Sequence, residues 1–156
     1  MACDRKGFST IIATILTISL AVVGSAVYYV AVTGYMRPEP GLSPNITLTV
    51  GASGFTVVSA QIVNSGGVPF TSVVISIAGN SSQLQITYSS SLSVGGGTAT
   101  VSARGISGGQ YTALSPNTSV SGNLAASPGT SYAVVIECTL SNGATFSQAT
   151  SVVASP

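Results

Sequence analysis

The first feature of the chain is an unbroken apolar stretch close to its start. No charged residue occurs over residues 7–36. As an α-helix, this stretch would reach roughly 45 Å, which exceeds the ~30 Å hydrocarbon core of a bilayer. Tyrosines cluster at its far end, where amphipathic rings favour the membrane–water interface, and Pro38 then stops the helix. The pattern predicts a membrane-compatible helix over residues 8–37.

Small and hydroxyl side chains gather on one side of this helix. At 100° per residue they form a small-residue stripe, while large aliphatic side chains cover much of the remaining circumference. Such a stripe lets helices approach closely where apolar burial cannot discriminate between lipid and protein. The helix is therefore expected either to pack against other helices or to serve as a plain membrane anchor. The stripe consists of Thr10, Thr14, Thr17, Ala21, Gly24 and Ser25.

Beyond Pro40 the pattern changes to short β-rich runs separated by Gly, Ser, Asn and Pro. Apolar and polar positions alternate, as in Ile46, Leu48 and Val50, which is typical of half-buried strands. Residues 141–143, with the sequence Ser-Asn-Gly, predict a hairpin between the last two strands. The expected strands are Ile46–Val50, Thr56–Val63, Ser72–Ile77, Gln83–Tyr88, Thr98–Ala103, Ser119–Leu124, Ser131–Leu140 and Ala144–Val153.

Seven or eight strands at spacings near ten residues predict an immunoglobulin-like antiparallel β-sandwich. The Cys…Trp…Cys signature of true immunoglobulin domains is absent. The fold class is therefore α+β, with a long N-terminal hydrophobic helix before the β-sandwich. The expected organisation is a charged N-terminal segment over residues 1–7, the helix over 8–37, a linker over 38–44 and the β-sandwich over 45–156.

Composition narrows the range of functions. Charged residues make up 4% of the 156 residues, with four basic and three acidic side chains and no His. A typical soluble domain has roughly 25%. A net charge of +1 offers no basic patch for nucleic-acid phosphates. Three dispersed acids cannot build a carboxylate metal site or a catalytic carboxylate pair. We therefore expect no enzyme activity, no cofactor, no metal and no nucleic-acid partner.

The two cysteines, Cys3 and Cys138, have no neighbour at metal-ligand spacing. The predicted helix places them on opposite sides of a membrane, which leaves no route to a disulfide within one chain. Cys138 falls inside a predicted strand and the sequence has no His to activate it. It is therefore expected to be a buried, inert thiol.

The predicted outer faces of the β-sandwich carry Ser, Thr, Gln, Ala and Gly where charges are usual. Because charges normally protect sheet edges from pairing, such a surface is expected to be covered by sugar or buried against neighbours. Asn45, Asn80 and Asn117 match the N-glycosylation acceptor pattern. O-linked sugar on the Ser/Thr-rich surface is equally compatible with the sequence.

Four other side chains of the β-sandwich are candidates for contacts. Arg104 and Glu137 are its two charges, and either form an ion pair, remain solvated, or contact another subunit or a ligand. Tyr111 and Tyr132 are expected to pack in the domain rather than to stack on sugars.

The start of the apolar stretch is the most informative segment. Residues 5–7, with the sequence Arg-Lys-Gly, precede Phe8 and the long uncharged helix. This arrangement resembles the class III leader of type IV pilins, in which a prepilin peptidase cuts before the hydrophobic segment. The resemblance implies cleavage between Gly7 and Phe8. Bacterial members usually have Glu at the fifth mature position, where this chain has Ile12, and in this respect it is closer to archaeal pilins.

The resemblance implies a structural subunit of an extracellular archaeal pilus used for surface adhesion. Its helix would form the filament core after a stage in the cytoplasmic membrane, with the N-terminus inside. The implied partners are copies of itself, the prepilin peptidase, and an assembly ATPase with its membrane platform. Two alternatives remain open at this point. One is an archaellum filament subunit, and the other is a solitary membrane-anchored β-sandwich that binds sugar or another ligand.

Overall fold

The computed structural model describes residues 5–35 and 38–156, with side chains described for residues 12–32 and 38–156. These residues fall into a helical unit and a β domain, and the latter spans Pro38–Pro156. Cys3, like the rest of residues 1–4, lies outside the described residues.

The helical unit is a single helix, α1 (Arg5–Tyr35). It begins three residues before the predicted start at Phe8 and continues through most of the predicted range. Its segment Ile12–Val32 has a mean hydropathy of 2.1 and is long and apolar enough to cross a membrane. A helix that is apolar on all sides requires a nonpolar environment around its whole circumference. The expected N-terminal hydrophobic helix is confirmed.

The β domain has nine strands among the described residues, in a single sheet of order β6-β5-β2-β1-β9-β8-β3-β4-β7. Neighbouring strands pair antiparallel, except β1 and β9, which run parallel. The strands are β1 (Leu42–Val50), β2 (Phe55–Asn64), β3 (Phe70–Ala78), β4 (Gln83–Tyr88), β5 (Thr98–Ile106), β6 (Tyr111–Ala113), β7 (Thr118–Gly122), β8 (Ser131–Leu140) and β9 (Thr145–Ser155).

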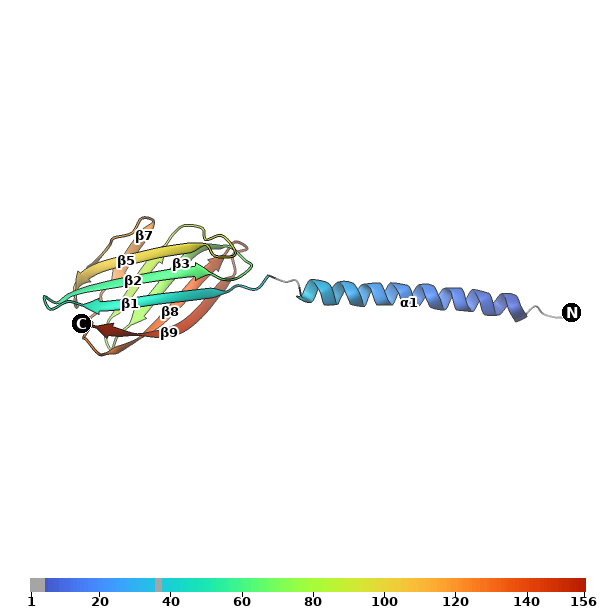
Figure 1. Cartoon of the computed structure of the whole chain (residues 1–156), viewed down its shortest axis with the longest axis horizontal. Coiled ribbons are helices and arrows are strands. Elements are labelled where there is room, and N and C mark those ends of the chain that lie inside the picture. The colour runs from blue at the N-terminus through green and yellow to red at the C-terminus, as the bar shows by residue number, and fades with distance from the viewer. Residues whose placement is uncertain (1–4, 36–37) are drawn as a thin grey trace. The chain divides into compact units, whose positions relative to one another are not determined.

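The sheet folds over into two layers and nearly closes on itself (Figure 1). One layer contains β6, β5, β2 and β1, and the other contains β9, β8, β3, β4 and β7. β1 joins β9 through Leu48 and Thr49. At the other end of the order, Gln110 beside β6 bridges to Asn123 beside β7. This near closure shields the outermost strands, so part of the missing edge charge has a structural cause.

The α+β class is confirmed, but the prediction of seven or eight strands was wrong. The missed strand is β6, whose three residues are too short to produce a visible alternation. β1 was also predicted too short, because it begins at Leu42, inside the expected linker. Pro44 is tolerated there because it pairs with Ile62 of β2 in a part of β1 that has no second neighbour.

The core lies between the two layers. Inward positions alternate with outward ones along the strands, as in β2 and β8. Phe70, the largest fully buried side chain, is contributed by β3, and Ile62 and Ile136 come from the opposing layers. The predicted hairpin at residues 141–143 is confirmed between β8 and β9, with Gly143 at a φ of 83°.

The loop between β2 and β3, residues 65–69, lies at one end of the β domain; we call it the glycine loop and that end the base. Asn64 is fully buried, donates its side-chain amide to the carbonyls of Val68 (2.8 Å) and Leu92 (3.4 Å), and accepts from the N–H of Gly66 (3.1 Å). The loop packs so closely on residues 39–41 that a Cβ on Gly66 would overlap their backbone. Asn64 therefore holds the loop against the segment that enters β1.

The buried thiol predicted for Cys138 is confirmed, because its side chain is fully buried in β8. Burial raises the pKa of Cys138 from 9.0 to about 11. Burial also raises the pKa of Tyr111, whose hydroxyl donates to the carbonyl of Leu124 at 3.0 Å. The folded domain therefore retains both protons in alkaline solution after an unfolded chain has lost them.

We expect the free energy of unfolding of the β domain to fall as the pH rises through the range from about 9 to about 11. Over that range the folded state binds more protons than the unfolded state, so raising the pH favours unfolding. The Cys138 shift alone corresponds to a loss of about 2–3 kcal/mol. Chemical denaturation of the full chain in detergent at a series of pH values measures it. A Cys138→Ala variant should lose less stability over this range, and an equal loss would contradict the assignment.

Candidate assembly and modification sites

The surface of α1 is apolar and exposed in the isolated chain. Side chains from Ile12 to Ala31 are all exposed, and Leu20 reaches 74%. Its hydroxyl groups are turned back onto the helix, since Thr17 donates to the carbonyl of Ala13 and Ser25 to that of Val22, both at 2.8 Å. Such internal bonds satisfy polar groups where water is absent. The helix is thus chemically suited to lipid or to a dry bundle of helices.

The predicted small-residue stripe lies on this exposed helix. Ala21 and Gly24 are exposed, and a Cβ built on Gly24 meets nothing within 4 Å. The side chain of Thr10 is outside the described residues. At Gly24, the helix itself therefore leaves room for a close partner.

The proposed cleavage position lies within α1. Gly7 and Phe8 both have helical backbone, and their side chains are outside the described residues. Residues 7–35 therefore continue the same helix directly from Arg5 and Lys6. Cleavage between Gly7 and Phe8 stays a prediction.

The three candidate glycosylation residues are all exposed, but their surroundings differ. Asn45 lies within β1, opposite Gln61 of β2. Asn80 lies in the turn after β3. Asn117 occupies the turn between β6 and β7 with a left-handed backbone, at a φ of 55°. A turn presents its side chain further from the sheet than a paired strand does, which favours Asn80 and Asn117 over Asn45 as acceptors.

We expect glycopeptide mass spectrometry of the native protein to find sugar on Asn117. The Ser119→Ala variant removes the acceptor pattern while leaving Asn117, and its left-handed backbone, in place. It should therefore lower the mass of the chain by one glycan. Thr118→Ala is the matched control, because the middle position is free in the pattern. Sugar confined to Asn45, or an unchanged mass in the Ser119→Ala variant, would contradict the prediction.

The two charges expected in the β-sandwich lie in different layers. Arg104 is on β5, and its guanidinium carbon is 4.5 Å from the centre of the Phe55 ring, a cation–π arrangement. Glu137 is exposed on β8. Among the described residues, Arg104 therefore contacts an aromatic ring of its own layer.

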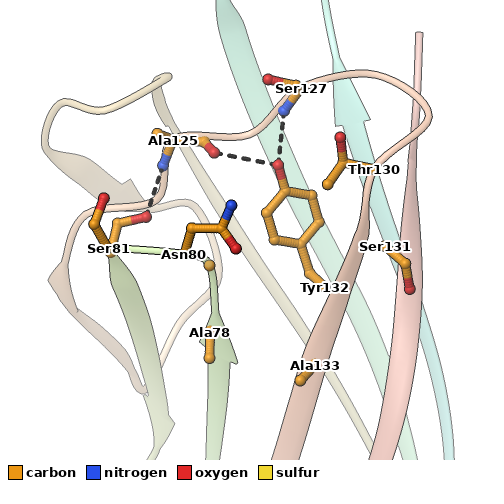
Figure 2. A pocket seen from close by; sticks show the side chains of 11 residues that line it. Ala78, Asn80, Ser81, Ala125, Ser127, Thr130, Ser131, Tyr132 and Ala133 are labelled. Carbon is orange, nitrogen blue, oxygen red and sulfur yellow. Dashed lines mark hydrogen bonds between the residues drawn. The ribbon is translucent and has the colours of Figure 1, made fainter.

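A hollow of about 570 Å³ lies beside Tyr132, between the turn after β3 and the segment before β8 (Figure 2). The Tyr132 hydroxyl accepts from the N–H of Ser127 (2.8 Å) and donates to the carbonyl of Ala125 (3.2 Å). Tyr132 is 5% exposed and Tyr111 is 8% exposed, so the predicted packing of both tyrosines is confirmed. The remaining lining is small and mostly polar, unlike the apolar and aromatic lining usual for ligand pockets.

Metal-binding side chains are scattered. Within residues 5–35 and 38–156, no three His, Cys, Asp or Glu side chains gather into a group that can hold a metal ion.

Comparisons with known proteins add no family assignment. A search against protein-family models finds no match for this chain. A search among curated proteins likewise finds no match.

Proposed function

We propose that this chain is the structural subunit of an extracellular filament of the archaeal type IV pilus kind, used for surface adhesion. One observation carries the proposal: a charge-free helix is exposed around its circumference over Ile12–Ala31 and ends in a separately folded β domain. The leader resemblance at residues 5–8 supports the same reading. The function is assembly rather than catalysis.

This helix suits two environments, first the cytoplasmic membrane and then the core of a filament. Ile12–Val32 is long enough to reside in the cytoplasmic membrane before assembly. In a filament, neighbouring helices replace lipid around the same side chains, and the small-residue stripe allows close approach. An ion in such a core would need a buried partner, so the absence of charge over residues 7–36 fits a dry bundle. Leaving the membrane requires work, hence an assembly ATPase and its membrane platform.

The β domain is proposed as the outer part of the filament, with an immunoglobulin-like arrangement. β1, β2 and β5 in one layer and β9, β8 and β3 in the other match the positions of strands A, B, E and G, F, C of that fold. β6 departs from that fold. It lies beside β5 in the sheet, as strand D lies beside strand E, but it comes after β5 in the chain, whereas strand D comes before strand E. The outward faces carry few charges, which suits sugar cover or packing against neighbouring subunits.

Electron microscopy of sheared cell-surface material tests the proposal. Cells that make the chain should yield filaments containing it, and cells lacking it should yield none of that type. Loss of surface attachment with normal swimming identifies a pilus, whereas loss of swimming identifies an archaellum. Finding the chain only in the membrane fraction, as a monomer, would overturn the proposal in favour of an anchored β domain.

A further inference from the structure

One outward face of the β domain combines its cation with exposed apolar side chains. Arg104 and Ile106 on β5 lie next to Phe55 on β2, and Leu114 follows β6. We call these four residues the arginine patch. Ile106 is 58% exposed, Leu114 is 59% exposed and Phe55 is 37% exposed, and they border a hollow of about 270 Å³. Aromatic, aliphatic and Arg side chains in one patch have the composition of an interface core.

The opposite layer carries the complementary charge, Glu137, on its outward face. Glu137 projects outward from β8 beside Val135, which is 39% exposed. The residues opposite these two on β9 are Ser147 and Ala149, both exposed. We call Val135, Glu137, Ser147 and Ala149 the glutamate face. Val135, Ser147 and Ala149 have short side chains, so the exposed Glu137 carboxylate is accessible to a cation of another copy.

The two surfaces lie towards opposite ends of the domain. β1 starts beside the glycine loop at the base and ends at the hairpin that precedes Phe55, so the arginine patch is at the end far from the base. β8 ends at Leu140, opposite Phe70 and next to Pro69, where Ser141 donates to the Pro69 carbonyl. Glu137 is thus about 10 Å from the base. The strands of the two layers are visible in Figure 1.

We propose that the arginine patch of one subunit docks on the glutamate face of a second copy, with Arg104 paired to Glu137. This proposal rests on the filament function. When one copy uses its arginine patch and the next its glutamate face, the contact is heterologous, and repeating it produces an open helical polymer wherever the rotation between copies does not close a ring. It thereby supplies a specific contact between outer domains, in addition to the packing of helices.

Charge complementarity selects a second copy as the occupant. Arg104 is the one cation of the chain after Arg37, and Glu137 is the one acid after Glu39. A surface with so few charges offers few competing partners, so a single pair sets the register between copies. The Phe55 ring holds the guanidinium in place, which reduces the side-chain entropy lost on docking.

Charge reversal in the full chain tests the contact. Arg104→Glu and Glu137→Arg should each lower the yield of sheared filaments by about tenfold, because each places like charges face to face. The double variant Arg104→Glu/Glu137→Arg should restore the yield. Arg104→Glu combined with Glu39→Arg is the matched control and should not restore it. Both side chains are exposed, so the amount of chain in the membrane fraction should stay constant.

Cross-linking separates failure of this contact from failure of the filament function. In an Arg104→Lys variant, a carbodiimide should condense the new amine with the Glu137 carboxylate of a second copy to give covalent dimers, and adding Glu137→Gln should remove them. Filaments without these dimers, or single reversals without loss of yield, would overturn the contact alone. If the wild-type chain forms no filaments, the filament function fails, and the cross-link in membranes still decides whether copies meet through this pair.

Discussion

Replacing Gly24 with leucine is expected to lower filament yield by about tenfold or more. An extra isobutyl group in a close helix contact causes overpacking, which costs about 1–3 kcal/mol per contact. The free helix accommodates the change, because a Cβ at Gly24 meets nothing within 4 Å and leucine is a better helix former than glycine. Any loss of yield therefore reports on neighbouring subunits. Filament mass recovered by shearing, relative to chain in the membrane fraction, is the measurement.

Ser19→Leu is the matched control for this change. Ser19 lies about 180° around the helix from Thr10, the start of the stripe, at 100° per residue. Its hydroxyl donates to the carbonyl of Ile15, a bond internal to the helix. The Ser19→Leu variant should retain most of the wild-type yield, and Thr14→Leu should behave like Gly24→Leu. Equal filament yields from all three variants would contradict the role proposed for the small-residue stripe in helix packing.

Replacing Asn64 with alanine is expected to lower the free energy of unfolding of the β domain by roughly 3 kcal/mol. The change leaves the Val68 carbonyl and the Gly66 N–H without their side-chain partner, while the Leu92 carbonyl still accepts from the N–H of Phe70 at 3.1 Å. Each buried polar group left unpaired costs about 1–3 kcal/mol. Thermal unfolding of the full chain in detergent should show a midpoint lower by roughly 10 °C.

A local measurement shows whether this loss arises at the base of the domain. Ser65 donates to the Gly41 carbonyl and Gly67 to the Glu39 carbonyl, so these amides should exchange hydrogen faster in the Asn64→Ala variant. Asn123→Ala is the control, because its exposed side chain makes one long bond of 3.4 Å to Gly108. A similar loss of stability in both variants would contradict the role given to Asn64.

The strongest local patterns predicted the fold correctly. The helix followed from an uninterrupted apolar stretch, and the last hairpin followed from Asn142 and Gly143, whose turn chemistry acts within a few residues. The predictions from sequence failed where the structure depends on contacts between residues far apart in the chain. Residues 42–44 join β1 because Asn64 and its neighbours in β2 pair with them. The near closure of the sheet depends on Gln110 meeting Asn123, which no local pattern encodes.

The candidate sites also divide into those that local patterns predict and those that depend on distant contacts. The helix stripe and the acceptor asparagines could be identified from spacing alone. The arginine patch could not, because Phe55 and Arg104 meet only through the pairing of β2 with β5. Near closure of the sheet also gives a second explanation for the uncharged surface of the β domain. Because near closure protects the outermost strands, those strands do not need charged side chains. The outward faces of β5 and β8 remain the places where contacts between copies are expected.

The central claim is that the part of α1 from Phe8 onward is retained on the mature subunit and assembles in filaments. Mass spectrometry of the N-terminus of the chain, taken from sheared filaments, tests this most directly. The account predicts filaments whose subunits start at Phe8, with the whole stretch from Ile12 to Val32 retained. A chain that starts at Val27, recovered without filaments, would show that the apolar stretch is a discarded secretion signal and would contradict the account.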